Sequence, residues 1–126
     1  MKNGLLLINL GTPSNPTTPA VKTYLREFLA DKRVISLPAL LRYLLLYTVI
    51  LPFRSKKSAH AYQAIWTADG SPLLCHSRAL VDKLQLRLGK KCKVVLGMRY
   101  GKPSLQDALL QLQGCETLTI LPLYPQ

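Results

Sequence analysis

The sequence predicts an α/β fold with three layers, in which a short parallel sheet is flanked by helices. Residues 5–8 form an apolar run without polar alternation, which is typical of a strand covered on both faces. Residues 94–96 form a second short apolar strand, and residues 117–121 form a third that ends at Pro122. Helical periodicity fills the intervals between them. This β-α-β-α-β order, with right-handed crossovers, makes half of a doubly wound sheet.

The first strand is expected at the centre of the sheet and leads into Asn-Leu-Gly-Thr-Pro at residues 9–13. Gly11 permits an unusual backbone and Pro13 ends strand pairing, so the chain should leave the sheet at its carboxyl edge. In open α/β sheets this edge is where ligands bind. The alternative is a plain core strand followed by a turn.

Four helices are predicted from periodicity and capping. They cover residues 19–30, with Thr18 as the N-cap and Pro19 as the first helical residue, then 55–66, then Pro72 to Gly89, and 103–113. The apolar stripes of the first, third and fourth helices are expected to face the core. These stripes comprise Val21, Leu25, Phe28 and Leu29; Leu73, Leu80, Val81, Leu84 and Leu88; and Leu105, Ala108, Leu109 and Leu112.

Composition indicates one folded domain of 126 residues, because 48% of them are hydrophobic and only 18% are charged. Seventeen Lys and Arg against six Asp and Glu give a net charge of +11, so a charged partner should be anionic. The sign alone does not choose between nucleic acid, an acidic membrane surface and an anionic small molecule.

Cys75, Cys92 and Cys115 lie far apart and lack C-x-x-C spacing. Neither a disulfide framework nor a closed zinc site is expected, and reduced cytosolic thiols fit this pattern. The apolar run at residues 5–8 is too short for a secretory signal and is not followed by a cleavage site. A cytoplasmic protein is therefore expected.

Residues 37–53 form a segment that is apolar all round, with Arg42 as its only charge and prolines expected to close it at both ends. It is shorter than the roughly 20 residues that span a bilayer. Lys32 and Arg33 precede it, and further basic residues follow it from Arg54. Such a segment suits an anionic membrane interface, and a buried core helix is the alternative.

The chemistry should come from the loops at the strand ends, at residues 9–13, 99–102 and 123–126, since no complete catalytic or phosphate-binding motif is present. Arg99, beside a tyrosine, suits a bidentate hold on a carboxylate or phosphate, and a structural ion pair is the alternative. His60 and His76 are interpreted as partly exposed helix residues rather than metal ligands.

Six motifs, in this order, resemble ferrochelatase, the enzyme family that inserts ferrous iron into a porphyrin to make heme. They are LLLINLGTP, YLREFLADKRVISLP, RSKKSAHAYQAIW, GSPLL, GMRYGKPS and LPLYPQ, and they cover nearly the whole chain. The resemblance implies a fold of two Rossmann-like domains that face each other across a porphyrin cleft, with an apolar lip on the membrane.

The resemblance also implies roles for seven residues. Residues 37–53 would be the lip segment, and Leu10 would lie against the macrocycle. Arg54, Tyr62 and Ser71 would surround the propionates of the porphyrin. Three further residues, Arg99, Tyr100 and Tyr124, would lie low in the cleft, towards the metal-insertion site.

The chain departs from the family pattern because it does not contain the second half, where the family places its catalytic histidine and acidic partner. Neither His60 nor His76 matches the catalytic position. We therefore expect an amino-terminal domain or fragment that is inactive alone, with no catalytic residue, metal site or resident cofactor of its own. An iron-sulfur cluster, where family members carry one, would belong to the missing half.

The main interpretation makes ferrous iron and porphyrin the substrates, and the long apolar lip segment favours protoporphyrin over coproporphyrin. It adds an anionic membrane surface as a partner, which would place the protein on the inner face of the cell membrane. No nucleic acid is expected as a partner. The sequence does not indicate an oligomeric state. The alternative is a basic membrane-associated or nucleic-acid-binding module without catalysis.

Overall fold

The computed structural model describes residues 3–124 of the chain. It divides into two compact units. The sheet unit comprises the chain up to Thr12 together with the residues from Leu73 onward, and the helical unit comprises Pro13–Pro72.

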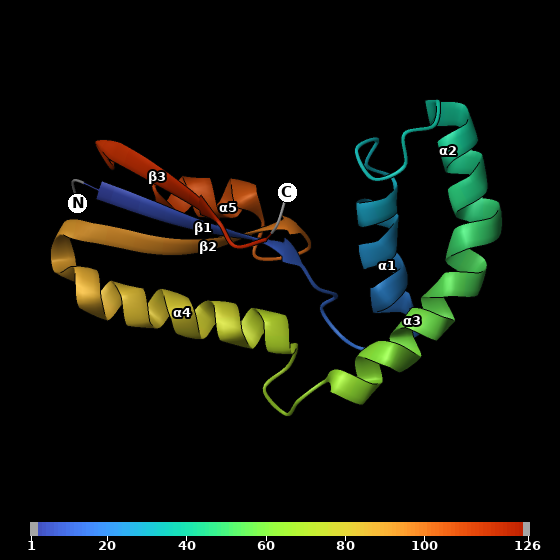
Figure 1. Cartoon of the computed structure of the whole chain (residues 1–126), viewed down its shortest axis with the longest axis horizontal. Coiled ribbons are helices and arrows are strands. Elements are labelled where there is room, and N and C mark those ends of the chain that lie inside the picture. The colour runs from blue at the N-terminus through green and yellow to red at the C-terminus, as the bar shows by residue number, and fades with distance from the viewer. Residues whose placement is uncertain (1–2, 125–126) are drawn as a thin grey trace. The chain divides into compact units, whose positions relative to one another are not determined.

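The sheet unit is built on three parallel strands, β1 (Asn3–Gly11), β2 (Cys92–Tyr100) and β3 (Thr117–Pro122). Their order is β2-β1-β3, so β1 is central, as predicted (Figure 1). In the register, Leu6 pairs with Val95 of β2 and with Ile120 of β3. β1 and β2 extend beyond the predicted apolar runs because their backbone pairing continues from Asn3 and Cys92 to Gly11 and Tyr100.

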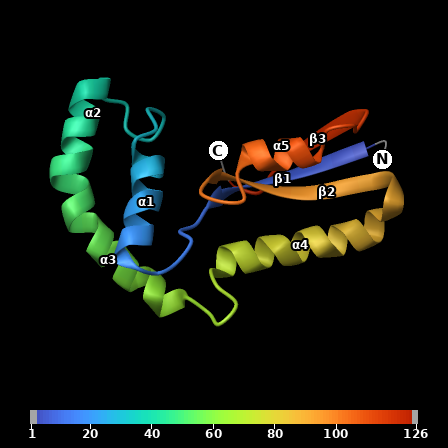
Figure 2. The same cartoon turned by 180° about the vertical axis from the view of Figure 1, so that it is seen from behind.

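Helices cover both faces of this sheet. On one face, Leu7 packs with residues of β2 and with Leu74, Val81 and Leu84 of α4 (Pro72–Leu88). On the other face, Leu6 packs with Ala108 of α5 (Leu105–Gln111), and Figure 2 shows the two helices on opposite sides of the strands. The predicted three-layer α/β fold with a short parallel sheet is confirmed.

Four leucines that were expected in the core are exposed instead. Leu73, Leu80 and Leu88 of α4 and Leu109 of α5 all belong to this group. Each helix touches the sheet along a narrow stripe. On α4 this stripe consists of Leu74, Val81 and Leu84, and on α5 it contains Ala108. The predicted stripe was too wide.

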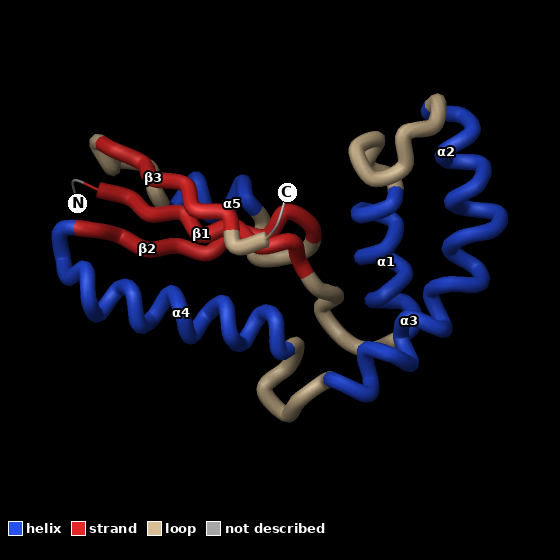
Figure 3. The backbone as a smooth tube through the Cα atoms, viewed as in Figure 1, coloured by secondary structure: helices blue, strands red, loops and turns tan. Residues whose placement is uncertain are grey.

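The helical unit contains α1 (Thr18–Leu29), α2 (Ala39–Leu45), the π-helical segment η1 (Leu46–Ile50) and α3 (Leu51–Ile65). α1 begins after Thr17, whose hydroxyl oxygen accepts from the Ala20 N–H at 3.4 Å, one residue before the predicted cap. α1 and α3 pack against each other (Figure 3). The predicted core positions Val21 and Leu25 are buried.

The prediction that Pro52 closes the lip segment is wrong, because α2, η1 and α3 form one continuous helical run from Ala39 to Ile65. Proline lacks an N–H and cannot donate to the carbonyl four residues earlier. The helix widens over η1, where the Leu51 N–H donates to the Leu46 carbonyl, five residues back. The wider turn accommodates the missing donor, so the helix passes through Pro52 instead of ending there.

Most of the lip segment is exposed rather than buried, and its exposed surface is largely apolar. Leu46 and Leu51 are buried, whereas Leu40 is 81% exposed and Phe53 is 76% exposed. The alternative of a buried core helix therefore applies only to the narrow stripe that contains Leu46 and Leu51. No helix within residues 3–124 is long and apolar enough to cross a membrane.

Candidate functional site

The carboxyl edge of the sheet holds four of the seven predicted site residues. Leu10 is exposed at the end of β1, and Arg99 and Tyr100 end β2. After β3, the Leu123 N–H donates to the Ile8 carbonyl at 2.7 Å, which holds the chain beside β1 as it reaches Tyr124. The parallel strands thus bring Leu10, Arg99, Tyr100 and Tyr124 to one edge, as the strand-end loops predict.

Gly11 allows β1 and β2 to approach closely at this edge. Its φ is +132°, a left-handed conformation that side chains disfavour, and it pairs with Tyr100 in the register. A Cβ atom at this position would overlap the carbonyl oxygen of Tyr100. The glycine that the sequence singled out is therefore required by space as well as by backbone conformation.

Asn9 ties the edge to the first turns of α4. Its side-chain amide donates to the Ser77 hydroxyl at 3.2 Å, and that hydroxyl donates to the Leu73 carbonyl at 2.7 Å. The Asn9 side-chain oxygen accepts from the Leu10 N–H at 2.8 Å. Sequence reasoning missed this positioning residue, because Ser77 lies 68 residues away and no local pattern joins the two.

Arg99 is oriented by its neighbour. The guanidinium carbon lies 5.4 Å from the centre of the Tyr100 ring, in cation–π range, and the Tyr100 ring is buried. A cation held in this way on the sheet edge can bind a planar anionic group without first being ordered.

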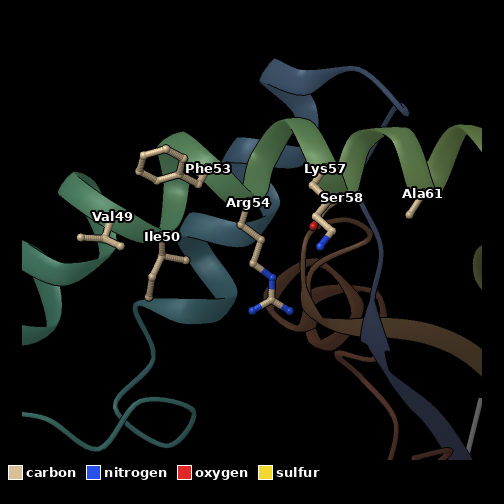
Figure 4. A pocket seen from close by; sticks show the side chains of 7 residues that line it. All are labelled: Val49, Ile50, Phe53, Arg54, Lys57, Ser58 and Ala61. Atoms are coloured by element: carbon tan, nitrogen blue, oxygen red, sulfur yellow. The ribbon is translucent and has the colours of Figure 1, made fainter.

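The other three predicted residues, Arg54, Tyr62 and Ser71, belong to the helical unit. Arg54 is exposed on α3 and lines a groove with a volume of about 760 Å³. The other lining residues are Val49, Ile50, Phe53, Lys57, Ser58 and Ala61. Figure 4 shows that the side chains of Arg54 and Lys57 extend from the same side of α3, next to the apolar end of the groove.

Lys57 is one of the basic residues after Arg54 that the sequence predicted only as a flank of the lip segment. The signal that could have identified it is its spacing, because residues three apart on a helix lie on the same face as neighbours. Arg54 and Lys57 therefore give the groove two cations, one helical turn apart.

Tyr62 lies half-buried on α3, with its ring edge-on to Trp66 at 6.4 Å between centroids. Burial raises the pKa of the Tyr62 phenol, so the group keeps its proton at neutral pH and can donate a hydrogen bond. Ser71 is buried and follows the turn in which the Thr67 hydroxyl donates to the Gly70 carbonyl at 2.8 Å. The seven predicted residues thus form two sets, one in each unit.

His60 on α3 and His76 on α4 are both exposed. None of the three cysteines forms a disulfide. Within residues 3–124, no group of three His, Cys, Asp or Glu side chains is arranged to hold a metal ion. The residues of the two sets offer apolar contact, hydrogen bonding and cation–anion attraction.

Comparison with known proteins gives a consistent match. The sequence model of the family described as Ferrochelatase matches residues 2–126. A ferrochelatase of Legionella pneumophila (strain Philadelphia 1) is 64% identical over 126 residues, and one of Coxiella burnetii (strain RSA 493) is 53% identical over 127 residues. The matches cover 100% and 99% of this chain but only 38% and 36% of the two relatives.

Proposed function

The chain belongs to the ferrochelatase family, and from this premise we propose that the protein makes heme by inserting ferrous iron into a porphyrin. The observation that carries the proposal is the family match over residues 2–126. Since the chain spans about 38% of the length of its Legionella relative, the activity is proposed for the intact protein. This chain would supply one wall and the lip of the porphyrin cleft.

The groove on α3 suits one end of such a substrate. A porphyrin is a flat apolar disc with two carboxylates, so its site needs apolar walls and cationic ends. Val49, Ile50 and Phe53 supply apolar surface, and Arg54 and Lys57 supply two cations beside it. We assign these two cations to the propionates, with the Tyr62 and Ser71 hydroxyls as further hydrogen-bond donors.

The sheet edge suits the other part of the substrate, because it can contact the macrocycle rather than the propionates. Leu10 offers an exposed apolar side chain, and Arg99, Tyr100 and Tyr124 are assigned to the part of the cleft nearer the metal-insertion site. A guanidinium is charged at neutral pH and has no acceptor atom. Arg99 would therefore hold an anionic group and would not remove a proton.

Metal insertion requires two acts from the protein, which are to hold the macrocycle in a distorted shape and to remove two pyrrole protons. In this proposal the present chain does the first. The base that performs the second, a histidine with an acidic partner, is assigned to a part of the protein beyond this chain, because His60 and His76 do not match the family position.

We also propose that the exposed side of the lip segment rests on an anionic membrane. Leu40, Leu41 and Leu44 leave apolar surface uncovered in the helical unit. Basic residues flank this surface at both ends. The same surface favours the less charged protoporphyrin over coproporphyrin.

A porphyrin titration of the purified chain tests the assignment of Arg54. Protoporphyrin fluorescence is followed at low and high salt for the unchanged chain, for Arg54→Gln and for the control Arg87→Gln, which removes an exposed cation from α4. We expect weak binding that largely survives high salt, because most of the binding is apolar. Arg54→Gln should weaken it roughly two- to fivefold, as expected for an exposed ion pair, and Arg87→Gln should not.

The same titration examines the alternative, a basic module that binds polyanions. Binding to a phosphate backbone falls steeply with salt. If porphyrin binding disappears at high salt and responds equally to both variants, the porphyrin assignment is wrong. The family match gives no support to the alternative.

A further inference from the structure

A second groove in the helical unit takes no part in the proposed porphyrin site. It has a volume of about 690 Å³ and lies where the loop after α1 enters α2. The groove is lined by Lys32, Arg33, Ser36, Leu37, Pro38, Ala39 and Arg42. Three of these seven residues are cations, one carries a hydroxyl and none is acidic. This combination suits an anion with several oxygen atoms.

Arg42 is held in place on the wall of this groove. Its Nη1 donates to the Leu37 carbonyl at 3.1 Å, and its guanidinium carbon lies 5.3 Å from the centre of the Tyr43 ring. Its Nε is buried and has no acceptor within residues 3–124. A side chain that is already ordered loses little freedom when it binds a ligand, so Arg42 is the strongest anchor for an anion here.

One acidic residue, Asp31, precedes the two cations on the loop. Its carboxylate accepts from the backbone N–H of Arg33 at 2.9 Å. Asp31 does not line the groove, and subtracting its charge from the three cations leaves the region net positive.

Exposed leucines follow the groove directly on α2. Leu40 is 81% exposed, Leu44 is 57% exposed and Leu41 is 52% exposed. A free phosphate would occupy the cations and leave these leucines in water. A phospholipid supplies both partners in one molecule, because its phosphate is joined to acyl chains that can cover apolar side chains.

We propose that this groove binds the headgroup phosphate of an anionic phospholipid, with Arg42 as the main contact and Lys32 and Arg33 as supporting cations. The inference rests on the proposed membrane contact and deepens it. It replaces a diffuse attraction between a basic protein and an acidic surface with a discrete phosphate site.

Cosedimentation with vesicles of phosphatidylcholine, with and without phosphatidylglycerol, tests the site. The variants are Arg42→Gln, Arg42→Lys and Lys32→Gln, and the matched control is the double variant Lys90→Gln/Lys91→Gln, which removes two exposed cations from the sheet unit. We expect Arg42→Gln to weaken binding about tenfold, as for a lost hydrogen bond to a charged group. Arg42→Lys should recover part of this loss, and the double control should change binding less than Arg42→Gln alone.

Lys32→Gln, a change at an exposed side chain, keeps the test valid if Arg42→Gln unfolds the helical unit; it should weaken binding severalfold. If the loss of binding follows only the number of charges removed, so that the double control loses most, the discrete site is wrong. If inorganic phosphate or an RNA binds in an Arg42-dependent manner while vesicle binding ignores Arg42, a lipid is the wrong ligand.

A further variant, Leu40→Ser/Leu44→Ser, separates this inference from the membrane contact on which it rests. Vesicle binding that is lost in the leucine variant but unchanged in Arg42→Gln would retain the apolar contact and overturn the phosphate site. Absence of binding to every vesicle would overturn both. The porphyrin titration tests the proposed function separately, because its result does not depend on whether the chain binds vesicles.

Discussion

Gly11 illustrates how one residue shapes the candidate site. Its positive φ and the nearness of the Tyr100 carbonyl both exclude a side chain. The close approach of β1 and β2 at this point places Leu10 beside the end of β2, where Arg99 and Tyr100 are located. The backbone conformation of Gly11 therefore determines which side chains lie next to each other at this edge.

Gly11→Ala should lower the free energy of unfolding by more than the roughly 1–3 kcal/mol of a strained backbone position, because the new Cβ also forces the strands apart. Urea denaturation followed by circular dichroism measures this loss. The control is Gly89→Ala, whose φ is +71° but whose surroundings are open; it should cost about 1 kcal/mol. Equal losses in the two variants would mean that the contact with Tyr100 is unimportant.

At the scale of elements, Gln85 joins the end of α4 to the outer strand β2. Its amide nitrogen donates to the carbonyls of Gly89 at 3.0 Å and Cys92 at 2.7 Å, and its amide oxygen accepts from the Val94 N–H at 2.9 Å. In the part of the chain that the structure describes, residues 3–124, no strand pairs with the other side of β2. The side chain thus satisfies backbone groups that an edge strand would otherwise leave open to another chain.

Gln85→Ala should destabilise the sheet unit by about 1–3 kcal/mol, because it leaves the partly buried Val94 N–H and Cys92 carbonyl without partners. Gln85→Glu keeps an acceptor for Val94 and should cost less. Amide hydrogen exchange of β2 reports the effect directly. The control Gln111→Ala, at an exposed position of α5, should stay within about 0.5 kcal/mol; exchange at Val94 that is no faster in Gln85→Ala than in the control would contradict the role.

At the scale of the whole molecule, the proposed cleft needs a second wall. A porphyrin resting on one wall leaves much of its apolar face in water and loses burial worth about 25 cal/mol per Å². The chain has net charge +11, which should attract the propionates, and the catalytic base is assigned to a part of the protein beyond this chain. We therefore expect porphyrin binding without catalysis.

The isolated chain should therefore insert neither ferrous iron nor zinc into protoporphyrin above the protein-free rate. Positioned proton transfer contributes about 10²- to 10⁴-fold and needs a base within hydrogen-bond reach. An anaerobic assay of porphyrin fluorescence measures insertion, with His60→Ala and His76→Ala run in parallel. Turnover that disappears in either variant would show that the catalytic base lies in this chain after all.

The sequence by itself determined the class of fold, the central place of β1, the first helix and the family. These follow from local patterns: an unbroken apolar run indicates a strand covered on both faces, and the periodicity around Val21 and Leu25 indicates one buried helix face. Ordered motifs over nearly the whole chain then indicated the family, which the match over residues 2–126 confirmed.

Only the tertiary structure decided which apolar residues are buried, how the helix continues through Pro52 and which distant side chains meet. Leu46 is buried and Leu40 is exposed, although both belong to one apolar segment. Asn9 contacts Ser77 across 68 residues of sequence. The physical reason is that a periodic pattern indicates only that one face of an element is buried. Which residues pack against that face depends on contacts between distant parts of the chain, and a local pattern does not contain this information.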